Sequence, residues 1–135
     1  MTVIVTDQGF GPEHWTGGFT PYEEYNGGPC GAVDLPNDVD AAEVFDRIKD
    51  AGLIRIPFPS FADGRGFSLA RRLRMLGYRG HLRARGHVLA DQYRNARRVG
   101  FDEVEIDDAL AARQPEVQWP KALPASYQDR VRAAG

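Results

Sequence analysis

Apolar and charged residues alternate along four short segments of the chain, which is the period-two pattern of β-strands with one buried face. In the second segment, for example, Ile54 and Ile56 flank Arg55. The four segments are residues 32–35, 53–58, 81–85 and 102–106. The charged positions within them are Asp34, Arg55, Arg83, Arg85, Glu103 and Glu105. Each strand is therefore expected to have one apolar and one charged face, with opposite charges on neighbouring strands.

Helical spacing of apolar residues follows each of these segments. The predicted helices cover residues 40–51, 69–76, 88–99 and 108–113. A glycine ends each of the first three, as a C′ residue does, at Gly52, Gly77 and Gly100. In the second helix the residues expected to face the sheet are Leu69, Leu73 and Leu76.

This order predicts an α/β protein of four consecutive βα units, because helical crossovers join parallel strands. The sheet is expected to be mainly parallel, with its helices on one face, in a half-(β/α)-barrel-like or two-layer arrangement. The charged face is then covered by the terminal segments or by a second subunit.

The two ends of the chain differ from this repeat. Residues 1–31 are interpreted as a loop-rich N-terminal arm with one possible strand at 3–6, because seven of the fifteen glycines lie there. Residues 32–113 form the predicted βα-repeat domain, and residues 114–135 form a proline-containing C-terminal tail. Aromatic residues in both end segments favour packing onto the domain or across a homodimer.

Composition indicates an ordinary globular protein, with 42% hydrophobic and 27% charged residues. The sequence has no apolar stretch of the ~18 residues that a membrane span needs, and its first residues do not resemble a signal peptide. Its single cysteine, Cys30, excludes an internal disulfide. A cytoplasmic protein without membrane contact is therefore expected.

Charge is unevenly distributed although the net charge is only −2. The segment 65–98 holds ten arginines and one acid, Asp91, whereas the flanking segments are acidic. This asymmetry indicates either an anionic partner or internal ion pairs. Nucleic acid is not the expected partner, because the arginines fall on several elements and the acidic remainder repels a phosphate backbone.

The segment 57–68 is the best candidate for a binding site. It connects a predicted strand to a helix, the position at which parallel α/β proteins bind ligands and a helix N-terminus attracts anions. Arg65 lies between two glycines, where neither helix propensity nor packing requires a long cationic side chain. Flexible backbone, a cation and a capping hydroxyl suit a small oxyanion. The predicted anion-binding residues are Gly64, Arg65, Gly66, Ser68 and, from the next strand end, Arg85.

Further polar residues follow the other strands, and the carboxyl ends of parallel strands meet at one edge of the sheet. Asn37, Asp38 and Asp107 are therefore expected at the rim of the site. Asp63 or His87 is the candidate general acid or base. Structural alternatives remain open, because the three rim residues also stand where helix caps occur and Asp63 precedes a glycine as in a turn.

Metal and cofactor chemistry has little support in the sequence. His14, His81 and His87 show no ligand spacing, and no cysteine–histidine cluster is present. The glycines before the second helix form neither a Walker loop nor a complete dinucleotide fingerprint. No metal site and no cofactor are therefore predicted.

Five short blocks resemble the DUF934 family of bacterial proteins of unknown function. The longest is Ile-Pro-Phe-Pro-Ser-Phe-Ala-Asp-Gly-Arg-Gly-Phe-Ser-Leu-Ala-Arg, residues 56–71, and the others are 35–40, 76–80, 86–92 and 97–102. The family is usually described as a probable oxidoreductase involved in sulfite reduction, on account of gene neighbourhood with sulfite reductase. The resemblance therefore implies a role in that pathway, without established catalytic residues.

Two hypotheses follow for the function. An oxidoreductase needs an electron carrier, and the sequence offers no iron–sulfur ligands, complete nucleotide fingerprint or redox cysteine pair. The favoured hypothesis is an accessory protein of assimilatory sulfite and sulfate reduction that binds the reductase, a small oxyanion, or both, at the 57–68 loop. The alternative is a small enzyme acting on a sulfur- or phosphate-bearing metabolite, with Asp63 or His87 as acid or base.

Overall fold

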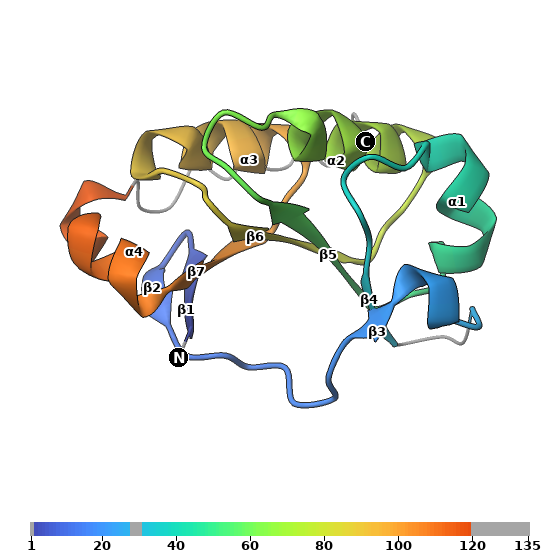
Figure 1. Cartoon of the computed structure of the whole chain (residues 1–135), viewed down its shortest axis with the longest axis horizontal. Coiled ribbons are helices and arrows are strands. Elements are labelled where there is room, and N and C mark those ends of the chain that lie inside the picture. Colours follow the sequence, from blue (N-terminus) through green and yellow to red (C-terminus); the bar gives the residue numbers. More distant parts are fainter. Residues whose placement is uncertain (1, 28–30, 120–135) are drawn as a thin grey trace.

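The computed structural model describes residues 2–27 and 31–119, which form an open seven-stranded sheet with the order β2-β1-β7-β6-β5-β4-β3 (Figure 1). The strands are β1 (Thr2–Thr6), β2 (Gly9–Gly11), β3 (Thr20–Pro21), β4 (Ala32–Asp34), β5 (Leu53–Phe58), β6 (His81–Gly86) and β7 (Glu103–Asp107). The helices are α1 (Ala41–Ile48), α2 (Arg65–Leu76), α3 (Tyr93–Val99) and α4 (Asp108–Arg113), with 3₁₀ turns η1 (Tyr22–Glu24), η2 (Ala90–Gln92) and η3 (Glu116–Gln118). None of the helices described here is long and apolar enough to cross a membrane. Cys30 and the tail beyond Trp119 lie outside the described residues.

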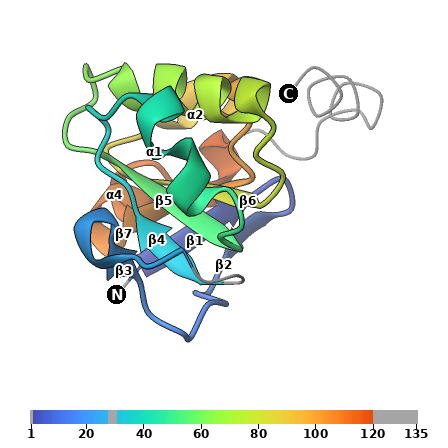
Figure 2. The same ribbon diagram turned by 90° about the vertical axis from the view of Figure 1, so that its right-hand side faces the viewer.

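The predicted βα repeat is confirmed. Strands β4, β5, β6 and β7 are neighbours in sequence order and run parallel. Helices α1, α2 and α3 lie on the convex face of the arched sheet, as Figure 1 and the rotated view in Figure 2 show. The sheet does not close into a barrel, so the architecture is a half-barrel-like sheet with helices on its outer face.

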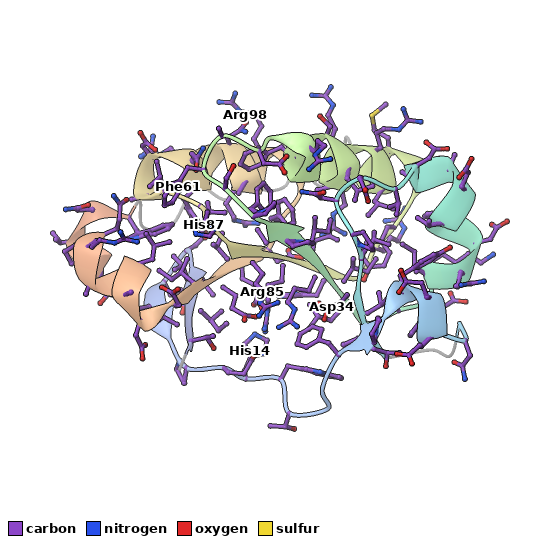
Figure 3. All side chains as sticks on the ribbon, viewed as in Figure 1. His14, Asp34, Phe61, Arg85, His87 and Arg98 are labelled. Carbon is purple, nitrogen blue, oxygen red and sulfur yellow. The ribbon has the colours of Figure 1, made fainter. Side chains whose placement is uncertain are left out.

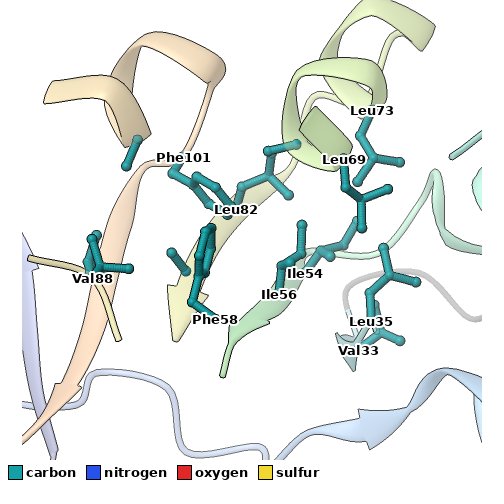
Figure 4. Close-up of a cluster of buried hydrophobic side chains, with 14 of the residues drawn as sticks. Val33, Leu35, Ile54, Ile56, Phe58, Leu69, Leu73, Leu82, Val88 and Phe101 are labelled. Atoms are coloured by element: carbon teal, nitrogen blue, oxygen red, sulfur yellow. The ribbon is translucent and has the colours of Figure 1, made fainter. Parts of the chain in front are cut away.

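The apolar face of the sheet packs against the helices because the strand register aligns its apolar residues. Val33, Ile54 and Leu82 are direct partners across β4, β5 and β6, and all three are fully buried. Leu69 and Leu73 of α2 pack over this row (Figure 4). Burial of each such side chain contributes about 1.5–3 kcal/mol, so this layer holds the strand ends in fixed positions.

Helix α2 begins earlier than the sequence pattern predicts. It starts at Arg65 rather than at 69, because Asp63 accepts a hydrogen bond from the Arg65 backbone N–H and the turn continues directly into the helix. The expected inward position of Leu76 is wrong, since this last residue of α2 is exposed. The helix predicted over 88–99 divides into η2 and the shorter α3.

The three predicted glycine joints do not behave alike. Gly77 and Gly100 end α2 and α3 in the left-handed conformation, with φ of 109° and 118°, as a helix-ending glycine does. Gly52 is not left-handed, so its predicted role is wrong. Helix α1 already ends at Ile48, and the Gly52 N–H instead donates to the carbonyl of Gly31 at 2.8 Å, at the entry to the sheet.

The N-terminal arm contributes strands as well as loops. Strand β1 joins the sheet beside β7 and runs antiparallel to it, β2 pairs with β1, and β3 pairs with β4 at the opposite edge. The prediction of a loop-rich arm with one strand at 3–6 is therefore incomplete. Because β2 and β3 lie at opposite edges, residues 12–19 cross the charged, concave face of the sheet (Figure 1).

The described part of the C-terminal tail packs on the domain. Trp119 is buried, and its ring contacts Phe10 and Tyr93 in edge-on geometry. Its indole N–H donates to the carbonyl of Gln114 at 2.7 Å. Trp119 thus contacts β2, α3 and the residue that follows α4.

Candidate functional site

A pocket lies at the carboxyl ends of β5, β6 and β7, the edge at which parallel α/β proteins bind ligands. Its volume is about 280 Å³. The first residue of β1 reaches it because β1 runs antiparallel to β7. The lining residues are Thr2, Pro57, Phe58, Pro59, Arg85, Gly86, His87, Glu105, Ile106 and Asp107. The pocket therefore brings together three residues of the predicted site, Arg85, His87 and Asp107.

Gly86 shapes the pocket by allowing β6 to approach the end of β5. Its φ of 113° disfavours a side chain, and a Cβ there lies 2.7 Å from the carbonyl oxygen of Phe58. The same carbonyl accepts a hydrogen bond from the backbone N–H of His87 at 2.9 Å. This turn sets the position of His87 at the pocket rim.

Arg85 is the cation of the pocket. Its side chain is 54% exposed, and its Nε lies 3.5 Å from Oε2 of Glu105. Its guanidinium donates no hydrogen bond to any group in the part of the chain that the structure describes. Since a guanidinium carries five N–H donors, Arg85 keeps most of its donor capacity for a ligand.

His87 is the second polar side chain of the rim. Its ring contacts Phe61 edge-on, with centroids 5.0 Å apart (Figure 3). Its Nδ1 lies 3.2 Å from the carbonyl oxygen of Phe58. Because a carbonyl only accepts hydrogen bonds, this contact assigns the proton of the neutral ring to Nδ1 and leaves a lone pair on Nε2. Nε2 can therefore accept a proton or a hydrogen bond from a ligand.

Arg65 and Asp63 form an ion pair at the start of α2. Nε and Nη2 of Arg65 donate to the two carboxylate oxygens at 3.1 and 2.8 Å. Asn37 donates from Nδ2 to Asp63 at 3.1 Å and to the Pro57 carbonyl at 3.2 Å. These hydrogen bonds, above all those from Arg65, hold the pKa of Asp63 well below its usual range. Asp63 is therefore ionised at neutral pH and is a poor general acid or base.

The remaining loop residues have structural positions. Gly64 is the N-cap residue of α2, whereas Ser68 is the fourth residue of the helix and is exposed, so the expected capping by the Ser68 hydroxyl is wrong. Gly66 is buried under Phe58, and a Cβ at this position lies 2.5 Å from the Phe58 ring. Gly66 therefore allows α2 to pack closely on β5.

The predicted rim residues differ in their contacts. Asp107 accepts a hydrogen bond at Oδ1 from the backbone N–H of Leu110 at 2.8 Å and caps α4. Asp38 is exposed, and the N-cap of α1 is Asp40, which makes no side-chain capping bond. Asn37 instead donates a hydrogen bond to Asp63, in the loop before α2. Among these residues, only Asp107 caps a helix.

Arg83 is fully buried at the centre of the charged face. Its Nε donates to Glu103, and its Nη1 donates to Glu105 at 2.8 Å. Its two terminal nitrogens also donate to Glu13 of the arm, each at 2.7 Å. Burial opposes the charge, but the hydrogen bonds to Glu13 and the two strand carboxylates outweigh burial and raise the pKa of Arg83. A terminal segment thus covers this face, which is one of the two predicted alternatives.

Arg55 is the next cation along the charged face. It donates to both oxygens of Asp34 at 2.6 and 2.9 Å, and to Glu105 at 3.2 Å. The ring of Phe19, from the arm, lies 3.7 Å from its guanidinium carbon. Figure 3 shows Asp34 and Arg85 on this concave side of the sheet. Opposite charges on the strands pair as predicted.

Three ligand-type side chains meet at the start of β7, and sequence reasoning missed them. His14 and His81 place Nε2 2.9 and 2.8 Å from Oε1 of Glu103, whose side chain is 2% exposed. Burial alone raises the pKa of Glu103, but its hydrogen bonds with His81 and His14 outweigh burial and lower it to about 2. Because 89 residues separate His14 from Glu103, no local spacing in the sequence indicates this cluster.

The fold and the pocket together define the class of protein: a small α/β protein with an open, mainly parallel sheet and a pocket at its carboxyl edge. A family model described as "Bacterial protein of unknown function (DUF934)" matches residues 32–135. The chain therefore belongs to the DUF934 family, as its sequence blocks predict. Comparison with curated proteins and with solved structures gave no match. The arm that supplies Glu13 and His14 lies outside the matched residues.

Proposed function

We propose that the protein is a cytoplasmic accessory component of sulfite and sulfate reduction, and that it binds a small oxyanion in the pocket at the ends of β5, β6 and β7. The observation that carries this proposal is the half-exposed guanidinium of Arg85 beside a pocket of about 280 Å³. A pocket of this size is slightly smaller than the usual small-molecule site, which suits an anion such as sulfite or sulfate. The pathway itself follows from the family resemblance.

Arg85 is a better candidate for the anion-binding cation than Arg65. Arg65 already makes two hydrogen bonds to Asp63, so an anion must displace a carboxylate that Asn37 also holds. Arg85 has a longer contact, 3.5 Å, with Glu105, and that carboxylate is already paired with two other arginines. We therefore favour the pocket over the loop before α2 as the anion site.

Thermal unfolding with sulfite, sulfate or adenylylated sulfate tests this site, with sodium chloride at equal ionic strength as the reference. A ligand that binds only the folded state raises the unfolding midpoint by mass action. We expect Arg85→Ala to remove that increase and Arg65→Ala to retain it. Loss of the increase in Arg65→Ala alone identifies the loop as the site, and no increase with any of the three anions excludes an anion site.

Association with sulfite reductase is the second part of the proposal, and the surface of α2 and α3 supports it. Both helices carry exposed arginines, Arg71, Arg72, Arg94 and Arg98 (Figure 3 labels the last of these). A basic face of this kind suits an acidic partner surface and gives an association that weakens with salt. We expect the two proteins to co-purify at micromolar concentration, and Arg71→Glu with Arg94→Glu to weaken the complex. Failure to associate at low salt contradicts this part of the proposal.

A second candidate function, a small enzyme acting on a sulfur- or phosphate-bearing metabolite, is favoured by one observation at His87. The contact between Nδ1 and the Phe58 carbonyl leaves Nε2 available as a general base at the pocket rim. Asp63, the other predicted acid or base, is held by Arg65. Release of sulfite or phosphate from such metabolites measures this activity. Turnover that His87→Gln abolishes supports it, and turnover unchanged in that variant excludes His87 as the base.

A further inference from the structure

We propose that His14, His81 and Glu103 bind a divalent transition-metal ion on the concave face of the sheet. The three residues come from the N-terminal arm, the first position of β6 and the first position of β7. Their ligand atoms all lie within 4.8 Å of one another. The site is at the amino-terminal ends of these strands, opposite the pocket, so it is independent of the proposed anion site.

The distances in the cluster fit coordination of one ion. The two imidazole Nε2 atoms lie 2.9 and 2.8 Å from the same carboxylate oxygen, Oε1 of Glu103. Two ligands bonded at ~2.1 Å to one metal are about 3.0 Å apart at right angles and about 3.4 Å apart in a tetrahedron, so the imidazoles must move away from Oε1 by roughly 0.1–0.6 Å when an ion enters. Two imidazoles and one carboxylate suit zinc, iron, cobalt or nickel, whereas magnesium and calcium prefer oxygen ligands alone.

The groups around the cluster can accommodate an ion in place of the direct hydrogen bonds. A neutral imidazole has one N–H, yet His81 faces carboxylates with both nitrogens: Glu103 at Nε2 and Asp102 at Nδ1, 3.6 Å away. An ion at Nε2 lets the ring keep its proton on Nδ1, toward Asp102. This order of carboxylate, histidine and metal is that of the usual outer shell of a metal site, with Asp102 just beyond hydrogen-bond distance of Nδ1. Arg83 donates to Oε2 of Glu103, which orients Oε1 toward the two imidazoles.

The charge balance of the concave face also accommodates a cation. Among the described residues that form ion pairs on this face, four carboxylates, Asp34, Glu13, Glu103 and Glu105, stand against three arginines, Arg55, Arg83 and Arg85. The side chains of His14 and His81 are 55% and 40% exposed, so an ion can reach them from solvent. Three protein ligands leave at least one coordination position for water or another ligand, as in catalytic rather than structural zinc sites.

Metal titration of the untagged full-length chain, stripped with EDTA and dialysed, tests the proposal. Co²⁺ binding is followed by visible absorption, and Zn²⁺ binding by calorimetry. We expect one ion per chain and at least a tenfold loss of affinity in His14→Ala and in His81→Ala, since even outer-shell changes weaken metal sites 10–100-fold. The matched control is His87→Ala, whose histidine lies outside the cluster and which is expected to bind both ions as the unaltered chain does.

His14 is the decisive position because it lies on the exposed arm and its loss leaves the buried pairs of Glu103 intact. Circular dichroism of His14→Ala is expected to match that of the unaltered chain. Absence of Co²⁺ and Zn²⁺ binding overturns the proposal and leaves a hydrogen-bonded cluster. Binding that is unchanged in His14→Ala or His81→Ala, or is lost in His87→Ala, overturns it as well.

Discussion

Arg83→Met tests whether one arginine keeps the charged face of the sheet stable. The substitution retains an unbranched apolar side chain and removes the guanidinium. It leaves Glu103 and Glu105 without their buried hydrogen-bond donor, and it releases Glu13 of the arm. Arg83 is fully buried, so water can reach the two carboxylates only by entering the space that the guanidinium leaves.

The expected loss follows from these contacts. Removal of one partner from a buried ion pair destabilises a protein by about 3–5 kcal/mol. Glu105 retains Arg55 at 3.2 Å, and Glu103 retains two imidazoles, so we expect the lower value, about 3 kcal/mol. For a chain of this length that corresponds to a decrease of roughly 10–15 °C in the unfolding midpoint.

Urea unfolding followed by circular dichroism, in EDTA, measures this loss. The matched control is Arg85→Met, two residues further along the same strand, where the half-exposed side chain pairs at 3.5 Å. A pair of that kind contributes about 0–1 kcal/mol, so the control is expected to unfold close to the unaltered chain. A loss below about 1 kcal/mol in Arg83→Met, or one equal to the control, refutes the reasoning.

Two further substitutions test the pocket edge by the same unfolding assay. Gly86→Ala is expected to lower the free energy of unfolding by about 1–3 kcal/mol, because its Cβ meets the Phe58 carbonyl at 2.7 Å. The control is Gly64→Ala, which has no atom within 4 Å of its Cβ and is expected to be near neutral. Equal losses in the two variants contradict the conformational argument. Asp107→Ala is expected to lower the free energy of unfolding by about 1 kcal/mol, because it removes the cap of α4. The control is Asp38→Ala, since Asp38 caps no helix. An unchanged stability of Asp107→Ala shows that the cap contributes nothing.

The sequence predicts the parallel repeat well because the signals are local. Alternation within a strand decides which side chains face the helices, and Arg55 and Glu105 lie on the charged face as their positions require. Asp107 caps α4 because its carboxylate and the backbone N–H that donates to it, that of Leu110, are three residues apart. Most features that depend on a few consecutive residues agree, and the exceptions are the helix end at Gly52 and the cap at Ser68.

The errors arise where distant segments meet. Leu76 fits the apolar spacing of α2, yet as the last residue of the helix it is exposed. Gly66 is predicted from its loop to bind an anion, and the sequence does not indicate its close contact with the Phe58 ring. His14 joins Glu103 only because residues between β2 and β3 cross the whole sheet. The residues next to each of these positions form no pattern that predicts these environments.

The position of β1 has a consequence for how the chain folds. Val3 pairs with Ile106, so this pairing must close a loop of about a hundred residues, whereas β4, β5 and β6 each pair with the next strand along the chain. During synthesis β1 emerges long before β7, the strand with which it pairs. We therefore expect the parallel repeat to assemble before β1 pairs with β7, and the contacts of the arm with Arg83 to form late in folding.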